Sequence, residues 1–217
     1  MSRHSYRDQL ADQPLDFEIR SKEAIADGFW PYTRTILDHE KFDGETRAKD
    51  VRRDFLETGQ VVVVIPYDPK TDSVVVIRQF RIGSALALDK AAAIELPAGL
   101  VDPGEEVEAA AGRELTEETG MTAKAIERCF SMLSTPGLTT EHVNVFLAIV
   151  DASEMRANAG KADEDEDIHP ILTPFDDLLR AVDDGWVENG FLICCTHWFA
   201  RKGRARAQAL LGTISED

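Results

Sequence analysis

The sequence predicts an α/β protein, a mixed β-sheet sandwiched by helices with a small antiparallel β subdomain ahead of it. β-branched runs at residues 61–66 (VVVVIP) and 74–78 (VVVIR) flank a turn-forming segment, which is typical of two buried strands joined in a hairpin. Stretches with helical spacing of apolar residues separate the later apolar runs. Strands that frame helices, together with an antiparallel hairpin, favour this layered architecture.

The first 57 residues are expected to form the β subdomain. Residues 17–19 and 32–37 alternate apolar and polar side chains, and the Asp43-Gly44 pair is a turn signal. Three short strands are only marginally stable by themselves. We therefore expect residues 1–57 to pack on the main domain or on a second subunit, and residues 58–217 to form the main domain.

A short strand at residues 94–97 leads into the first predicted helix of the main domain. One face of this helix is apolar, with Val107, Ala110, Ala111 and Leu115 at helical spacing. Gly120 is placed to end the helix in the left-handed conformation. The sequence therefore predicts a helix that ends just before Gly120.

The remainder of the main domain alternates between loops, one strand and two helices. A loop at residues 134–141 precedes an apolar strand at residues 143–150, and an acidic loop follows at residues 160–167. Thr173-Pro174 is a favourable helix start, an N-cap followed by proline at the first helical position. Residues 191–200 are expected to form a second amphipathic helix.

Composition excludes several classes of function. A net charge of −16 over 217 residues argues against a nucleic-acid or anionic-membrane surface, because both are bound through clustered Lys and Arg. The three cysteines are sparse and odd in number, which fits a reducing compartment. The sequence has no signal-peptide pattern and no apolar window that approaches a membrane span, so we expect a cytoplasmic protein.

Three carboxylates on the first predicted helix point to a metal site. Glu114, Glu117 and Glu118 stand at positions i, i+3 and i+4, so all three project from one side of the helix. Like charges this close repel one another, and a bound divalent cation relieves that repulsion. Hard oxygen ligands suit Mg²⁺ or Mn²⁺. The alternative is a charged face that simply contacts solvent.

Residues 99–121 (GLVDPGEEVEAAAGRELTEETGM) resemble the signature of the Nudix hydrolases. The match includes every fixed position: Gly99, Glu105, Arg113, Glu114, Glu117, Glu118 and Gly120. Leu115 and Met121 occupy the two apolar positions. The resemblance implies an α/β/α sandwich that hydrolyses a diphosphate linkage with divalent cations.

Roles within this segment follow from the resemblance. It implies that Glu114, Glu117, Glu118 and the carbonyl of Ala98 are the metal ligands, with Glu118 also essential for catalysis. Glu105 and Arg113 are expected to tie the preceding loop to the helix. Independently of the resemblance, the conformational freedom of glycine leads us to expect that Gly99 lets the backbone turn sharply beside the metal.

Segments outside the signature resemble the ADP-ribose pyrophosphatase branch of this family. Pro136 lies 16 residues beyond Gly120, within residues 134–141 (STPGLTTE), where Leu138 stands in place of a second glycine. Residues 78–81 (RQFR) imply that Arg81 grips the diphosphate. Arg53 is implied to reach the base of a neighbouring subunit's substrate. Phe29, next to Trp30, is a candidate to stack on that base or an ordinary core or interface residue.

The general base is expected in a loop. In the resembled branch it is a glutamate of the acidic loop, and the aligned position is Glu164, with Glu166 as the second carboxylate. Glu141, at the end of the 134–141 loop, is assigned to substrate binding and is the third candidate for the base. A solvated, mobile loop is the alternative for the acidic run.

We therefore expect an Mg²⁺-dependent hydrolase that converts ADP-ribose, a small-molecule nucleotide sugar, to AMP and ribose 5-phosphate. Residues 156–160 (RANAG), ahead of residues 164–168, also resemble GDP-mannose pyrophosphatases, the alternative substrate class. A second alternative is a sensor that binds ADP-ribose without cleaving it. A homodimer is expected, because Arg53 and Phe29 would serve a neighbour's pocket.

Overall fold

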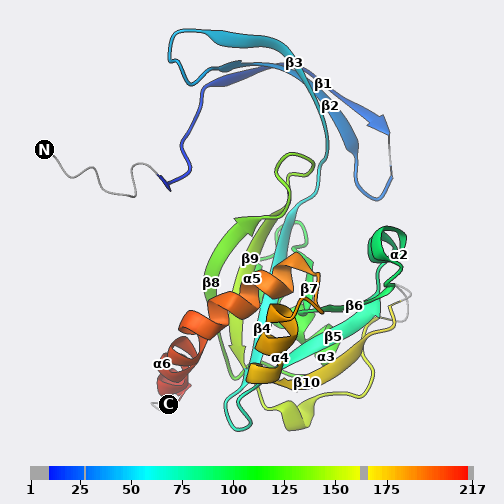
Figure 1. Cartoon of the computed structure of the whole chain (residues 1–217), viewed down its shortest axis with the longest axis vertical. Coiled ribbons are helices and arrows are strands. Elements are labelled where there is room, and N and C mark those ends of the chain that lie inside the picture. Colours follow the sequence, from blue (N-terminus) through cyan, green and yellow to red (C-terminus); the bar gives the residue numbers. More distant parts are fainter. Residues whose placement is uncertain (1–9, 27, 162–165, 215–217) are drawn as a thin grey trace, which may run out of the picture. The chain divides into compact units, whose positions relative to one another are not determined.

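The computed structural model describes residues 10–26, 28–161 and 166–214. Their contacts divide the chain into two compact units (Figure 1). The first unit comprises Met1–Thr58 and Thr135–Thr140, and the second comprises Gly59–Ser134 and Glu141–Asp217. A short segment between two strands of the second unit therefore belongs to the first.

The first unit is built on a three-stranded antiparallel sheet in the order β1-β2-β3. Its strands are β1 (Phe17–Ala26), β2 (Tyr32–Glu40) and β3 (Arg47–Leu56). The predicted strands at residues 17–19 and 32–37 lie within β1 and β2. At the end of β3, Leu56 pairs in parallel with Thr139, and the N–H of Leu56 donates to the carbonyl of Leu138 at 2.8 Å. The 134–141 loop is thus paired to the end of β3, which its sequence did not indicate.

A mixed sheet is the frame of the second unit, with strands in the order β10-β5-β4-β9-β8. These strands are β4 (Gln60–Asp68), β5 (Ser73–Phe80), β8 (Ala125–Leu133), β9 (His142–Ile149) and β10 (His169–Pro174). The pairing of β4 with β9 is parallel, whereas β5 with β10 and β8 with β9 are antiparallel. The predicted α/β class with a mixed sheet is confirmed.

The β4–β5 hairpin opens soon after its turn. The two strands pair only at Tyr67 with Val74 and at Asp68 with Ser73. Farther from the turn, β5 pairs with β6 (Ala92–Glu95) and β4 pairs with β7 (Ala98–Leu100). A short helix, α2 (Ile82–Leu88), connects β5 to β6. Because the two strands separate, β7, which precedes the helix with the three glutamates, can pair with β4 inside the sheet.

Alternation along β4 separates two hydrophobic layers. Val62 and Val64 face α3 (Val107–Thr119), while Val63 and Ile65 face the opposite layer. That layer contains α4 (Phe175–Asp183), α5 (Gly190–Trp198) and α6 (Arg204–Ile214), which lie together on one side of the sheet in Figure 1. The second unit is therefore an α/β/α sandwich.

One predicted helix boundary is confirmed and another is wrong. Gly120 ends α3 with φ of 79°, the left-handed conformation expected of it. In contrast, α4 begins at Phe175, and Thr173 and Pro174 belong to β10. They pair with Val74 and Ser73 of β5. Pairing to the neighbouring strand continues as far as Pro174 and so delays the helix by one residue.

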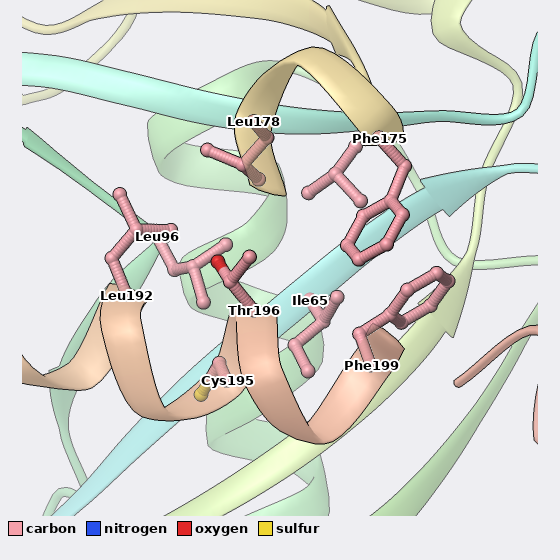
Figure 2. A pocket seen from close by; sticks show the side chains of 9 residues that line it. Ile65, Leu96, Phe175, Leu178, Leu192, Cys195, Thr196 and Phe199 are labelled. Carbon is pink, nitrogen blue, oxygen red and sulfur yellow. The ribbon is translucent and has the colours of Figure 1, made fainter. Parts of the chain in front are cut away.

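Thr196 of α5 is a buried polar residue in the apolar layer. Its hydroxyl has no hydrogen-bond partner among the described residues. Figure 2 shows it among apolar side chains that include Leu96, Phe175 and Leu192. They line a cavity of about 10 Å³, near the lower limit for one water molecule. A buried hydroxyl without a partner costs about 1–3 kcal/mol.

Replacing Thr196 with valine should therefore raise the free energy of unfolding by about 1 kcal/mol, because a methyl group of the same size takes the place of the hydroxyl. Urea denaturation measures the change. Thr119→Val is the matched control, since the equally buried Thr119 hydroxyl donates to the carbonyl of Leu115 and accepts from the N–H of Met121. The control should lower stability. A loss of stability in Thr196→Val would contradict the expectation.

Candidate active site

The acidic helix α3 holds its three carboxylates at different depths. The side chain of Glu117 is 25 % exposed and that of Glu114 is 12 % exposed. Glu118 is 3 % exposed, because it follows the apolar face formed by Ala111 and Leu115. The three acids therefore range from the partly exposed Glu117 to the buried Glu118, which lies beside β7.

Arg113 links the helix to the preceding loop and to two of these acids. Its Nε and Nη2 donate to the two carboxylate oxygens of Glu105 at 3.0 and 2.9 Å, and Nη2 also donates to the carbonyl of Leu100. Its Nη1 lies 2.6 Å from Glu114 Oε1 and 3.1 Å from Glu117 Oε2. The hydrogen bonds from Arg113 lower the pKa of Glu105 to about 2. The expected tie between Glu105, Arg113 and the loop is confirmed.

Gly99 is required here for space rather than for a turn. It lies within β7, paired with Val62, and its φ is not among the positive values of the chain. A Cβ added to it would meet the carboxylate of Glu114 at 2.1 Å. The expectation of a sharp turn at Gly99 is thus wrong: the glycine leaves room for the Glu114 carboxylate against the strand.

Glu118 is held by the same short strand. The N–H of Ala98 donates to Glu118 Oε2 at 2.8 Å. Burial raises the pKa of Glu118 to about 8, and the charges of Glu114 and Glu166 act in the same direction. Burial also raises the pKa of Glu114. In the absence of a metal, these two carboxylates are held where their negative charge is unfavourable, so a cation bound beside them would be strongly stabilised.

The donor set fits a hard divalent cation. Glu114, Glu117 and Glu118 offer carboxylate oxygens from one side of one helix, and β7 passes directly beside them. Within the described parts of the chain, no three acidic, histidine or cysteine groups lie at metal-binding distance of one another. Arg113 and Lys161 instead pair with the acids, and Lys161 Nζ lies 3.0 Å from Glu117 Oε2. In this arrangement the two cations partly neutralise the carboxylates of α3.

Arg81 follows β5 directly and is paired with Glu95. Its Nε and Nη2 donate to Glu95 Oε2 at 3.1 and 2.9 Å. Burial opposes the positive charge of Arg81, but Glu95, Glu118 and Glu166 together keep its pKa above the ordinary value. Arg81 is partly exposed and lies within electrostatic reach of the deepest acid of α3, as a phosphate-binding arginine would need to be.

Glu95 was not recognised in the sequence, although it organises this side of the site. It is buried and accepts hydrogen bonds from Gln79, Arg81 and Asn189. Asn189 also caps α5, because its Oδ1 accepts from the N–H of Leu192 at 2.9 Å. A charged residue in the middle of the apolar run IELP was the signal that could have revealed it.

The segment that precedes β10 packs on the C-terminal end of α3. The N–H of Arg156 donates to the carbonyl of Thr119, and the N–H of Gly160 donates to that of Glu117 at 3.1 Å. Glu166 accepts from the N–H of Lys161 at 3.2 Å. This packing places Glu166 near the acids of α3. Glu164, the expected base, lies outside the described residues.

A groove continues from Arg81 along α2 and the start of α5. Its volume is about 930 Å³, and its lining includes Arg78, Glu95 and Trp186. Pockets for small organic ligands measure about 300–1,000 Å³. The groove is therefore large enough for a substrate of nucleotide size, with Arg81 at one wall.

Comparison with known proteins decides the family. A family model described as NUDIX domain matches residues 57–190, more than half of the chain. The chain belongs to the NUDIX family. It is 32 % identical to the ADP-ribose pyrophosphatase of Escherichia coli over 84 % of this chain and 87 % of that protein. The ADP-ribose pyrophosphatase of Haemophilus influenzae is also 32 % identical, over 84 % and 85 % of the two chains.

A GDP-mannose pyrophosphatase of Cronobacter sakazakii is nearly as similar to this Nudix hydrolase. It is 31 % identical over 81 % of this chain and 90 % of that protein. Both named activities of the resemblance thus recur among the relatives.

In the part of the chain that the structure describes, no helix is long and apolar enough to cross a membrane.

The expected site residues of this Nudix hydrolase fall into two groups. Ala98, Arg81 and the acids of α3 come together in the second unit, with Glu166 close to them. Glu141 belongs to the second unit as well, at the residue before β9. Phe29 and Arg53 lie in the first unit, where Phe29 is 83 % exposed and contacts the ring of Trp30.

Proposed function

We propose that this Nudix hydrolase cleaves the diphosphate bond of ADP-ribose, giving AMP and ribose 5-phosphate, with Mg²⁺ or Mn²⁺ as cofactor. The observation on which the proposal mainly rests is that residues 95–98 hold both groups: Glu95 accepts a hydrogen bond from Arg81, and the N–H of Ala98 donates to the buried acid Glu118. One site then offers both a phosphate-binding cation and metal-binding oxygens. Relatives named for ADP-ribose, with matching coverage of both chains, support the choice of substrate.

The metal would be held by the carboxylates of Glu114, Glu117 and Glu118 and by the carbonyl of Ala98. When bound, it supplies Lewis-acid polarisation of the phosphoryl oxygens and a lower pKa for the attacking water. Gly99 keeps the space that the Glu114 carboxylate needs. Arg113 and Glu105 hold the loop against α3.

Arg81 would bind the diphosphate itself. Glu95 engages the Nε and Nη2 of the Arg81 guanidinium, and Nη1 donates to neither oxygen of Glu95, so the fork formed by Nη1 and Nη2 can meet the phosphate. Phosphate oxygens suit that planar fork as well as a carboxylate does. Glu95, itself fixed by Gln79 and Asn189, would orient the arginine while the substrate binds.

In the proposed reaction, the oxygen of a water molecule attacks one phosphorus of the diphosphate. The bond from that phosphorus to the bridging oxygen breaks, and the bridging oxygen leaves with the other phosphate and the electron pair. A carboxylate receives the proton of the water. We assign this role to Glu164, with Glu166 as the second loop carboxylate and Glu141 as a further substrate contact.

The choice among these carboxylates gives a direct prediction. Glu164→Gln should lower kcat by about 10²–10⁴-fold, the usual contribution of a general base, and leave KM nearly unchanged. Glu166→Gln and Glu141→Gln are the matched variants in the same assay. A larger loss in either of them would move the base to that residue.

Substrate choice is tested by incubating the protein and Mg²⁺ with ADP-ribose and with GDP-mannose, followed by chromatography of the products. AMP release with the larger kcat/KM supports the proposal, whereas preferential GMP release would support GDP-mannose as substrate. The second reading has its own support in the 31 % identity to a GDP-mannose pyrophosphatase. Tight ADP-ribose binding without cleavage would indicate a sensor instead.

We further propose a cytoplasmic homodimer that forms through the first unit. Every residue of β1 is exposed, and its apolar side chains include Phe17 and Ile19. A dimer would cover these side chains and would bring Phe29 and Arg53 to a neighbour's substrate. The free cysteines fit a reducing compartment. Light scattering at micromolar concentration should give twice the chain mass, and a monomer would contradict the proposal.

A further inference from the structure

The ammonium group of Lys161 contacts one of the carboxylates that would bind the metal. Lys161 Nζ lies 3.0 Å from Glu117 Oε2, and its side chain is 34 % exposed. The same Glu117 oxygen lies 3.1 Å from Nη1 of Arg113. Lys161 is therefore the second cation on a carboxylate that the proposed function assigns to the metal.

The charge of Lys161 extends to the other acids nearby. Burial raises the pKa of Glu114, and Arg113 and Lys161 oppose that shift. Arg113 lowers the pKa of Glu105 to about 2, and Lys161 acts in the same direction. One ammonium group thus partly neutralises the acidic group around α3.

The backbone next to Lys161 is held independently of this ion pair. The N–H of Gly160 donates to the carbonyl of Glu117, and the N–H of Lys161 donates to Glu166 Oε2. Ala159 forms a β-bridge with Ile168. A change at the lysine side chain therefore leaves its attachment to α3 in place, and the long flexible stem can swing away.

We propose that Lys161 is a built-in counter-ion of the metal site, which a divalent cation must displace from Glu117. The inference depends on the proposed metal role of Glu117. An ammonium and a divalent cation on the same carboxylate oxygen repel each other strongly at this distance. The ion pair is lost when the metal binds, so Lys161 weakens metal affinity and sets the metal concentration at which the site fills.

Mn²⁺ binding tests this directly, with the free ion counted by electron paramagnetic resonance. Lys161→Met should lower the Kd for Mn²⁺ by about 2–10-fold, since it removes a partly exposed ion pair. Lys161→Arg keeps the charge and should bind nearly as the wild type does. Lys124→Met is the matched control: Lys124 pairs with Asp151 at 3.0 Å with a side chain 42 % exposed, and the Kd should not change.

Thermal unfolding gives a second readout that does not depend on activity. The Tm of metal-free Lys161→Met should fall, and Mn²⁺ should raise it by more than it raises that of the wild type. Unchanged or weaker Mn²⁺ binding in this variant would overturn the role of Lys161. Glu117→Gln tests the metal role of Glu117 separately from the role of Lys161. If it binds Mn²⁺ as the wild type does, the metal assignment itself fails; if it binds weakly, only Lys161 is in question.

Discussion

Glu118→Gln is expected to lower the rate of nucleotide-sugar hydrolysis by about 10³-fold, because a metal ion contributes several kcal/mol of transition-state stabilisation and each 1.36 kcal/mol is a factor of ten. The fold should persist, since the amide oxygen of glutamine can still accept from the N–H of Ala98. AMP release measures the rate, and circular dichroism checks the fold. Turnover at the wild-type rate would refute the assignment of Glu118 to the metal.

The same variant should change how stability depends on pH. In the metal-free protein, burial raises the pKa of Glu118 to about 8, above its value in the unfolded chain. The neutral carboxyl is thus the form that folding favours. Its contribution is complete below about pH 4 and is lost as the pH rises through 8. From pH 5 to pH 9 the wild type should lose a few kcal/mol relative to Glu118→Gln, and Mg²⁺ should restore most of this loss.

Gly99→Ala should weaken metal binding while leaving the protein folded. The new methyl group would lie 2.1 Å from the Glu114 carboxylate, which is the free end of a flexible side chain and can move away. We expect a loss in kcat/KM of about 10²-fold or more, because a displacement of 1 Å at a catalytic group costs that much. Calorimetric Mg²⁺ titration and AMP release measure the two effects.

Gly112→Ala is the control for this substitution. A Cβ on Gly112 of α3 would meet no atom within 4 Å other than those of its chain neighbours and its own helix backbone. It should raise stability by up to about 1 kcal/mol, because alanine favours a helix more than glycine does, and leave activity unchanged. Wild-type metal affinity in Gly99→Ala would show that the Glu114 carboxylate does not need its position against β7.

The parts of the site that were predictable from the sequence are local in the chain. Glu114, Glu117 and Glu118 share one helix, so their spacing alone places them on one side. The partners of Glu95 could not be inferred this way. Arg81 is 14 residues from it and Asn189 is 94 residues from it, and strand pairing and a helix cap bring them together.

The two corrected expectations have a common physical cause. Gly99 and Thr173-Pro174 were read from local backbone preference, as a turn and as a helix start. In the structure, each is held in a strand by its neighbour, Gly99 by Val62 and Thr173 by Val74. Tertiary pairing overrode local preference at both places. The fold class was less sensitive to such details, because it depends on the order of many elements.

The return of Thr135–Thr140 to the first unit makes that unit discontinuous in sequence. The chain crosses between the units after residues 58, 134 and 140. The backbone hydrogen bond from the N–H of Leu56 to the carbonyl of Leu138 joins two segments that are far apart in sequence. A protease that cut the chain at Gly59 would therefore not release the first unit freely, because the 135–140 segment would still hold the end of β3. The unit that contains the N-terminal sheet is thus joined to the rest of the chain by three covalent connections rather than by a single linker.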